Sequence, residues 1–309
     1  MKTALITGAL GQDGFFLVKK LLESGNYHII CTSRSFKQNI NSVYKHENID
    51  LELLDIENEC AIFNTVKKYK PDELYHLASF SAPILSWDNP KDVISINGNS
   101  TMVFLEAIRL YSNKTKFFFP SSGKIFGSFT ETPQTEDTPV EPKDPYSLGK
   151  YVGHQAVKLY RNKFSIFACN GILYNHESHL KNVNFVVYKI CHFAQLLKQK
   201  KIESFSLLNL NSSIDLGDPR DYVDAMNIIL QQDSPDDYII AMNTSISIKE
   251  ICLLVGKLLD IPDILSYIKV EQMSNKQNRI VGDNTKLKKI GWSPRYNTED
   301  ALRMILNNI

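Results

Sequence analysis

The feature that most constrains the fold is a regular alternation of short apolar segments with amphipathic ones. Residues 4–7 have the character of a buried strand, a glycine-rich turn follows, and residues 15–22 have the apolar spacing of a helix. The unit recurs: strands are expected at residues 28–31, 51–55, 73–77, 116–119 and 165–169, and helices at 61–69, 103–111 and 146–160. Such alternation specifies right-handed crossovers. We therefore predict an α/β fold built on a doubly wound parallel sheet.

The turn after the first strand carries Gly8, Gly11 and Gly14, with Gln12 and Asp13 between the last two. Glycines at this spacing allow a tight turn and let a pyrophosphate approach the backbone at a helix N-terminus. A turn that serves packing alone is the alternative, but strand, turn and helix follow one another in the order that a dinucleotide site requires. The turn therefore predicts a Rossmann-type domain that binds a dinucleotide.

After residue 168 the alternation loosens, which indicates a smaller lobe. Residues 222–230 have a helical pattern, and the segment 215–232 is expected to return to the sheet. We expect a dinucleotide-binding Rossmann domain at residues 1–168 with about 212–243, and a smaller mixed α/β substrate-binding lobe at 169–211 and 244–309.

The second and third strands bear on the choice of dinucleotide. No acidic residue follows the second strand to bind a ribose diol; Arg34 stands there instead. Arg34 could meet a 2′-phosphate, stack on adenine or be a solvated loop residue, so NAD is expected and NADP stays open. Asp55, at the end of the third strand, could accept a hydrogen bond from the adenine amine or cap the next helix.

The composition argues against several other classes of protein. With 35 basic and 34 acidic residues the net charge is +1, which does not indicate a nucleic-acid or membrane surface. The apolar N-terminal run is too short for a signal peptide, and no stretch approaches the roughly 18 apolar residues of a spanning helix, so a cytoplasmic protein is expected. The five cysteines are widely spaced without a C-x-x-C pair, and His176 and His179 lack a third ligand nearby, so no disulfide or metal is expected.

Tyr146 and Lys150 stand four residues apart in an expected helix, shortly after Ser122. Residues four apart lie on one helix face, so the ammonium is expected to lower the pKa of the phenol from about 10 towards neutrality. A phenolate can take the proton of an alcohol while hydride leaves its carbon. These residues therefore predict hydride transfer to or from a nicotinamide.

These motifs resemble those of a known family. The glycine turn from Thr7 to Gly14, the segment 76–79, Ser122 and the Tyr146/Lys150 pair resemble the extended short-chain dehydrogenases/reductases. More narrowly, the segments 170–178, 184–186 with Lys189, 221–226 and 231–233 look like GDP-mannose 4,6-dehydratase, and the similarity runs almost end to end.

The resemblance implies roles for particular residues. Ser122 and Tyr146 would hold the substrate C4 hydroxyl, and Lys150 would bind the nicotinamide ribose and tune Tyr146. The implied cofactor residues are Gly8, Gly11, Gln12, Asp13, Gly14, Arg34, Asp55, Ile56, Leu77, Ala78, Ser79, Tyr146 and Lys150. The implied substrate residues are Ser81, Ser86, Lys124, Asn175, Asn184, Val186, Lys189, Arg220 and Arg279. A turn network at residues 175–178 and a solvated Lys189 are the structural alternatives.

Two departures from the family pattern matter. Lys124 stands where the dehydratases carry the glutamate that removes the C5 proton, and a protonated lysine is no base unless burial strips its charge. Residues 275–277, before the segment 279–283, also differ from the basic and acidic pattern that the dehydratases carry near the nucleotide. Recognition of a diphosphate sugar is therefore better indicated than recognition of guanine.

The expected activity is NAD(P)-dependent oxidation at C4 of a GDP-manno-type sugar nucleotide, either GDP-mannose or GDP-manno-heptose, without dehydration, in polysaccharide sugar biosynthesis. A second carbonyl compound would reoxidise the cofactor. The rivals are a GDP-sugar 4,6-dehydratase with another base, a 4-ketoreductase running in reverse, and a non-catalytic sugar-nucleotide sensor. The intact Ser122, Tyr146 and Lys150 set argues against the sensor.

A homodimer or higher oligomer is also expected. The resemblance implies that two helices per subunit pack into a four-helix bundle. The helix from residue 146 to 160 carries apolar residues for such packing: Val152, Ala156, Val157 and Leu159.

Overall fold

A computed structural model describes residues 1–36, 41–127, 132–271 and 280–309. Its centre is a seven-stranded sheet in the order β11-β6-β5-β4-β1-β2-β3, with every pairing parallel. The strands are β1 (Lys2–Thr7), β2 (Tyr27–Ser33), β3 (Ile49–Leu53), β4 (Glu73–His76), β5 (Lys116–Ser122), β6 (Ala168–Leu173) and β11 (Asp237–Ile240). The predicted doubly wound parallel sheet is confirmed.

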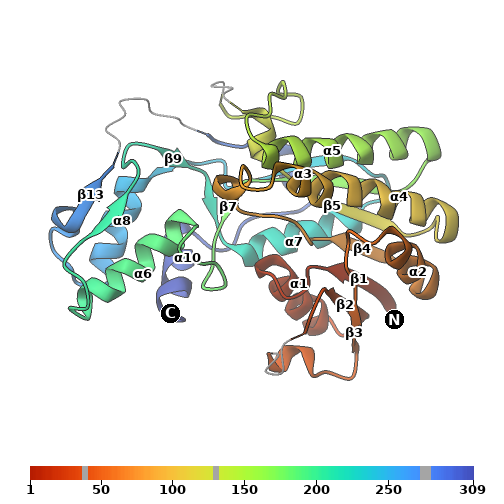
Figure 1. Cartoon of the computed structure of the whole chain (residues 1–309), viewed down its shortest axis with the longest axis horizontal. Helices are drawn as coiled ribbons and strands as arrows, with labels where there is room; N and C mark the ends of the chain where they lie inside the picture. Colours follow the sequence, from red (N-terminus) through yellow and green to blue (C-terminus); the bar gives the residue numbers. More distant parts are fainter. Residues whose placement is uncertain (37–40, 128–131, 272–279) are drawn as a thin grey trace.

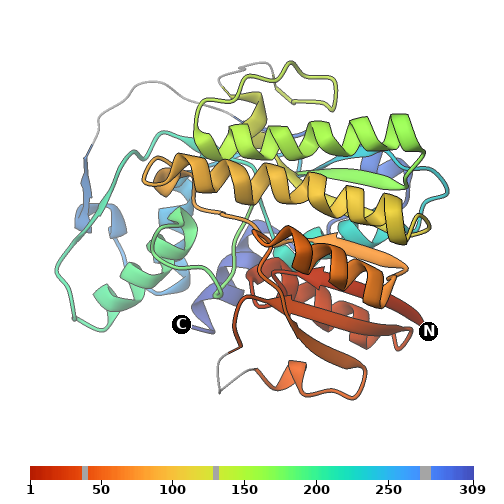
Figure 2. The ribbon, with the colours of Figure 1, turned by 45° about the vertical axis from the view of Figure 1, so that its right-hand side comes forward.

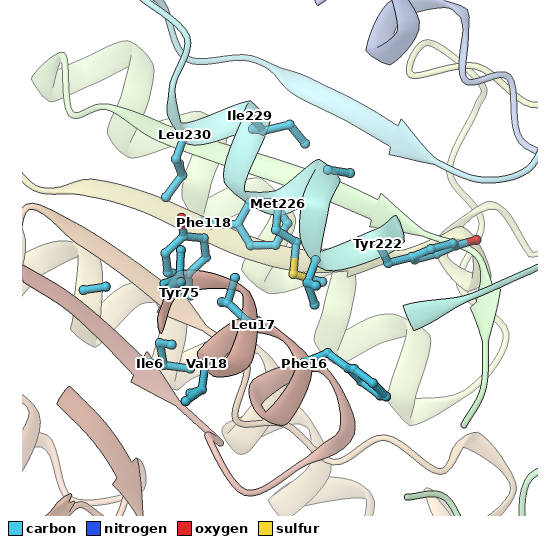
Figure 3. Close-up of a cluster of buried hydrophobic side chains, with 14 of the residues drawn as sticks. Ile6, Phe16, Leu17, Val18, Tyr75, Phe118, Tyr222, Met226, Ile229 and Leu230 are labelled. Atoms are coloured by element: carbon cyan, nitrogen blue, oxygen red, sulfur yellow. The ribbon is translucent and has the colours of Figure 1, made fainter. Parts of the chain in front are cut away.

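Helices cover both faces of this sheet (Figures 1 and 2). One layer contains α2 (Glu59–Tyr69), α4 (Ser100–Tyr111) and α5 (Pro145–Phe164), and the other contains α1 (Gln12–Glu23) and α7 (Pro219–Leu230). Neighbouring residues of β5 serve opposite layers: Phe117 and Phe119 pack with α4 and α5, while Phe118 packs with α1 and α7. Figure 3 shows this second core, where Leu17 of α1 and Met226 of α7 meet Phe118 and Tyr75.

The second half of the chain adds a smaller lobe beside the sheet (Figure 1). Its core is formed by α6 (Val186–Lys198), α8 (Ile248–Leu258) and α10 (Thr298–Leu306), with β8 (Phe205–Leu207) paired to β13 (Ile268–Val270). Two short strand pairs are added: β7 (Asn175–His176) with β10 (Leu216–Gly217), and β9 (Ser213–Ile214) with β12 (Ile246–Ser247), of which the second packs against the lobe's core. Helix α9 (Thr285–Lys289) precedes the last helix. In the described residues, no helix has the length and apolar character that crossing a bilayer demands.

The segment between β4 and α4 is also largely helical. Residues Pro90–Ile94 form α3, residues Ser95–Asn99 form a π-helical turn, and the two run directly into α4. Single 3₁₀ turns cover Ser42–Tyr44, Pro83–Leu85, Gly123–Phe126 and Ile264–Tyr267.

The strand predicted at residues 165–169 is displaced. The preceding helix continues to Phe164 and ends at Ser165 in a left-handed conformation with φ 54°, so β6 starts at Ala168. Polar Asn170 and Gly171 hid this strand in the sequence, yet both are buried, and Asn170 donates to Asp237 of the neighbouring β11. Strand β6 thus crosses residue 168, where the predicted domain division falls; the division itself stays a prediction.

Candidate active site

Two adjoining cavities lie at the carboxyl ends of the sheet strands. The first, of about 330 Å³, is lined by the glycine turn, the ends of β2 and β3 and the segment after β4. The second, of about 510 Å³, is lined by the end of β5, the start of α5, the residues after β6 and the segment before α6. Both cavities share the following residues: Asp13, Leu77, Ser79, Ser81 and Lys181. Ligands in the two cavities would therefore meet at these residues.

The glycine turn forms the floor of the first cavity. Gly8 has φ +66°, and a Cβ there would lie 2.7 Å from the backbone of Ala78. A Cβ at Gly14 would lie 2.5 Å from the carbonyl oxygen of Gly8. Gly11 precedes α1 without a side-chain cap, so the first N–H groups of the helix face outward for an anion. This cradle fits the diphosphate of a dinucleotide.

The remaining predicted cofactor residues gather around the same cavity. Arg34, Asp55, Ile56 and the segment 77–79 line it together with Gln12 and Asp13. The alternative that Asp55 caps a helix is wrong, because Asn58 caps α2 by accepting from the N–H of Ala61, while Asp55 accepts from the N–H of Glu57.

A buried chain of hydrogen bonds holds the segment after β4. The Thr7 hydroxyl lies 2.9 Å from Nδ1 of His76 and accepts from the N–H of Ala78, while Nε2 of His76 lies 2.9 Å from the Ser100 hydroxyl. Burial lowers the pKa of His76 to about 3, so its ring is neutral. His76 therefore fixes the strip of backbone that both cavities share.

The three predicted catalytic residues meet in the second cavity. Ser122 ends β5, and Tyr146 and Lys150 project from the first two turns of α5. Asp144 caps α5 by accepting from the N–H of Ser147 at 2.7 Å, which fixes where the helix begins. The hydroxyl of Ser122 lies close enough to the phenol of Tyr146 to lower its pKa, and Nζ of Lys150 donates to the carbonyl oxygen of Pro120 at 2.9 Å.

The prediction that Lys150 lowers the pKa of Tyr146 is wrong. Burial, opposed in part by the nearby Ser122 hydroxyl, raises the pKa of Tyr146 to about 12. Burial also lowers the pKa of Lys150 to about 7, although Asp13 favours its charged form. A buried amino group that loses its charge near neutral pH and points at Pro120 cannot stabilise the phenolate.

The predicted substrate residues divide into two groups. Ser81, Lys124, Asn175 and Val186 line the second cavity, and Lys124 is exposed. Others lie outside that lining in the described chain: Ser86, Asn184, Lys189 and Arg220. Arg279 falls outside the described residues.

The contacts of two residues in the second group explain their positions. The buried hydroxyl of Ser86 donates to the carbonyl oxygen of Pro83. The guanidinium of Arg220 is bidentate to Asp218, at 2.9 and 2.7 Å, and stacks 3.6 Å from the ring centroid of Tyr296. Both side chains therefore have partners within the protein.

The segment 175–178 does more than form a local turn. Nε2 of His176 lies 3.0 Å from Oδ1 of Asp13, and the Ser178 hydroxyl donates to Oε1 of Gln12 at 2.9 Å. The buried carboxylate of Glu177 accepts from the N–H groups of Val187 and Tyr188 at the start of α6. This segment thus ties the glycine turn to the smaller lobe.

Sequence reasoning missed Lys181, which lines both cavities. Burial acts to raise the pKa of Asp13, but His176 and Lys181 together hold it well below its usual range. Lys181 also lowers the pKa of Lys150. Its place in the sequence, three residues after Ser178 in a matched segment, was the available signal.

Every carboxylate in the described lining of the second cavity already has a partner. Asp13 pairs with His176, Asp144 caps α5, and Glu177 binds the N-terminus of α6. The exposed Lys124 stands beside them, two residues from Ser122. The second cavity therefore combines the three predicted catalytic residues with carboxylates that already have partners.

Comparisons with known proteins agree with this arrangement. A family model described as GDP-mannose 4,6 dehydratase matches residues 5–305. GDP-mannose 4,6 dehydratase 2 of Caenorhabditis elegans is 32% identical over 319 residues, covering 99% of this chain and 82% of the relative. Human GDP-mannose 4,6 dehydratase is 31% identical over 340 residues, covering 98% and 90%.

Solved structures share the fold. dTDP-glucose 4,6-dehydratase from Bacillus anthracis, in complex with NAD, has a TM-score of 0.86 at 20% identity and covers 100% of this chain and 96% of that one. RMD from Pseudomonas aeruginosa, complexed with NADPH, has a TM-score of 0.85 at 18% identity, with coverages of 100% and 97%. Because the family match spans residues 5–305 and relatives exceed 30% identity over nearly the whole chain, this protein belongs to the GDP-mannose 4,6-dehydratase family of sugar-nucleotide enzymes within the short-chain dehydrogenases/reductases.

Proposed function

We propose that this protein oxidises C4 of a GDP-manno-type sugar nucleotide, GDP-mannose or GDP-manno-heptose, to the 4-keto sugar without removing water. The observation that carries the proposal is the pairing of an intact Ser122, Tyr146 and Lys150 set with Lys124 at the cavity wall. The setting proposed is cytoplasmic polysaccharide biosynthesis, with a homodimer or larger oligomer as the working form.

The residues of the second cavity divide the work of oxidation. Ser122 orients the C4 hydroxyl, and Tyr146 as phenolate takes its proton, which leaves the C4–O bond to become a carbonyl. When bound, the nicotinamide accepts the hydride that leaves C4. Lys150 holds the ribose next to it. The proton and the hydride together account for the two hydrogens that the sugar loses.

Dehydration needs one more group, a base for the C5 proton. The carbonyl at C4 acidifies that proton, but an exposed lysine, Lys124, stands at the cavity wall in place of a carboxylate, and an ammonium group accepts no proton. The neighbouring carboxylates of Asp13, Asp144 and Glu177 are held by the contacts described above. Elimination of water from the 4-keto sugar should therefore be slow or absent.

The first cavity supports NAD or NADP as the hydride acceptor. The cradle at Gly8 to Gly14 accommodates a diphosphate, and the exposed Arg34 at the rim suits either an adenine face or a 2′-phosphate. The solved relatives with NAD and with NADPH keep both possibilities in view. NAD is proposed, with a second carbonyl compound as the oxidant that restores it.

The relatives named as dehydratases favour a second candidate, a 4,6-dehydratase in which another group replaces the glutamate. The two reactions differ in cofactor use. A dehydratase returns its hydride to the sugar within each turnover, whereas a 4-dehydrogenase leaves the nicotinamide reduced.

The deciding experiment incubates the protein with NAD and either GDP-mannose or GDP-manno-heptose in deuterated water. Mass spectrometry should show loss of two hydrogens with C5 hydrogen retained, and the absorbance of reduced nicotinamide should rise in step. A 4-keto-6-deoxy product without net cofactor reduction would establish the dehydratase instead. The ketoreductase would be favoured if the protein does not oxidise either sugar nucleotide but, given reduced cofactor and a 4-keto sugar nucleotide, adds two hydrogens to it.

Two variants of Lys124 sharpen the result. Lys124→Glu supplies a carboxylate and should produce some dehydrated sugar, while Lys124→Gln removes the charge without supplying a base and should not. Equal products from both variants would show that the residue at 124 does not decide the outcome.

A further inference from the structure

The end of β5 carries the catalytic residue but has little support from neighbouring strands. β4 pairs with β5 from Lys116 to Phe118, whereas β6 pairs with it as far as Ser122. In the described sheet, residues 119–122 thus pair with a strand on one side only, and residues 120–122 line the second cavity. The position of residues 119–122 must therefore depend on the helix that packs on this face of the sheet.

Helix α5 packs directly on this end. A Cβ at Gly153 would lie 2.5 Å from the ring of Phe119, so glycine is needed for the helix to come so close. Tyr146, Lys150 and His154 follow one another at four-residue intervals along the helix, and their side chains contact Ser122, Pro120 and Ser121 respectively. Helix α5 therefore contacts three successive residues at the end of β5.

The His154 contact is buried and supported from behind. Nδ1 of His154 lies 3.1 Å from the hydroxyl of Ser121, and the two residues are 5% and 1% exposed. Nε2 lies 3.5 Å from Oδ2 of Asp237. Asp237 is in turn held by Arg161 and by Asn170, each donating to its Oδ1 at 2.9 Å.

These contacts favour one tautomer of the His154 ring. Although burial opposes its ionisation, Arg161 and His154 lower the pKa of Asp237, so the carboxylate can only accept. A carboxylate at 3.5 Å favours hydrogen on the nitrogen that faces it, Nε2. Burial lowers the pKa of His154 to about 4, which leaves Nδ1 as a bare acceptor for the hydroxyl of Ser121.

We propose that His154 is a positioning residue: by accepting a hydrogen bond from Ser121, with its tautomer set by Asp237, it locks the end of β5 to α5 and so aligns Ser122 with Tyr146. The role rests on the proposed hydride-transfer function. If Lys150 turns to the cofactor ribose and releases Pro120, the Ser121–His154 contact still holds the strand end.

The kinetic test compares His154→Leu, His154→Gln and Ser121→Ala in single-turnover reduction of NAD by the GDP-manno sugar. His154→Leu and Ser121→Ala should each lower the rate by about 10- to 100-fold with little change in substrate or cofactor Kd, because small misplacements of reacting groups cost that much. His154→Gln keeps an acceptor and should be clearly faster than the leucine variant. The double variant Ser121→Ala/His154→Leu should be no slower than either single one.

Val157→Ala is the control for stability. Val157 is fully buried on the same helix, so its truncation should lower the melting temperature while leaving the rate unchanged. If His154→Leu behaves like this control, or if the two single losses multiply in the double variant, the positioning role is overturned.

A second readout does not depend on activity. Nitrogen NMR of the histidine rings, with His154 assigned among the seven histidines by its loss in His154→Gln, should show hydrogen on Nε2 and none on Nδ1 at neutral pH. Hydrogen on Nδ1 would overturn the inference whatever the kinetics. If no GDP-manno sugar is oxidised by the unmutated protein, the proposed function fails by itself, and the tautomer still decides the arrangement around His154.

Discussion

Oδ1 of Asp13 lies 3.0 Å from Nε2 of His176, which joins the first turn of α1 to strand β7 across 163 residues of sequence. The ring of His176 also stacks on Tyr222 of α7, with centroids 4.2 Å apart. His176 thus connects the glycine turn, the wall of the second cavity and helix α7.

Replacing Asp13 by Asn should destabilise the protein in a pH-dependent way. Because the folded pKa of Asp13 lies below its unfolded value of about 3.9, its carboxylate stabilises the fold above that value and loses this effect as the pH falls. Asp13→Asn should cost about 1–3 kcal/mol at pH 7, and the gap in unfolding free energy to the unmutated protein should narrow as the pH falls below about 4, towards the lowered folded pKa. Urea unfolding at several pH values measures this.

A matched control exists on the surface. Asp50 and His28 form the same kind of pair at 3.0 Å, but both are substantially exposed, so Asp50→Asn should cost less than about 1 kcal/mol. A gap for Asp13→Asn that stays constant with pH would contradict the ion-pair explanation.

Tyr146→Phe should lower turnover by about two to four orders of magnitude, because it removes the only base positioned for the C4 hydroxyl in the proposed mechanism. Ser122→Ala should cost less, since Ser122 orients the hydroxyl without taking its final proton. Single-turnover kinetics measures both, with cofactor Kd as the control that should stay nearly unchanged. Full activity of Tyr146→Phe would remove this residue from the mechanism.

The pH dependence of oxidation should follow the phenol. Tyr146 acts as a base only when deprotonated, and its pKa is raised to about 12, so kcat/KM for oxidation should keep rising between about pH 7 and pH 10. The reverse reduction uses the protonated phenol and should not rise over this range. Initial rates in both directions test this prediction. A plateau in the oxidation rate already at neutral pH would show that the free enzyme holds a phenolate.

The predicted dimer should depend on the outer face of α5. Of the apolar residues expected to pack there, Ala156 and Val157 are buried within the subunit, which corrects that part of the prediction, whereas Leu159 is 65% exposed. Leu159→Lys should therefore shift the protein towards monomer in light scattering at micromolar concentration. Leu253→Lys, at an exposed site on α8, is the control and should leave the mass unchanged. A monomeric unmutated protein would refute the dimer itself.

The sequence predicts the local features well, because they depend on neighbouring residues. Each of three features is encoded by residues that are close together in the sequence: the glycine turn, the start of α5 after Asp144, and the individual strands of the sheet. The predicted position of strand β6 was wrong because its polar Asn170 is buried by pairing with Asp237, 67 positions away, which the local sequence does not reveal.

The same limit applies to the site. Tyr146 and Lys150 were predicted from their spacing and Ser122 from the family resemblance, but the direction of the Tyr146 pKa shift depends on burial and on the turn of Lys150 towards Pro120. No short pattern encodes those. Lys181 and the contacts of His176 depend likewise on how the smaller lobe meets the sheet.

Lys181 lies on the wall common to both cavities, and this has a thermodynamic consequence. A cofactor and a sugar nucleotide each carry a diphosphate, so two such ligands, one in each cavity, would share Lys181 as a neighbour. Whatever the first ligand does to the position or charge of Lys181 changes the affinity for the second, and the change must be the same in either order of binding. The two sites are in this sense a single electrostatic unit.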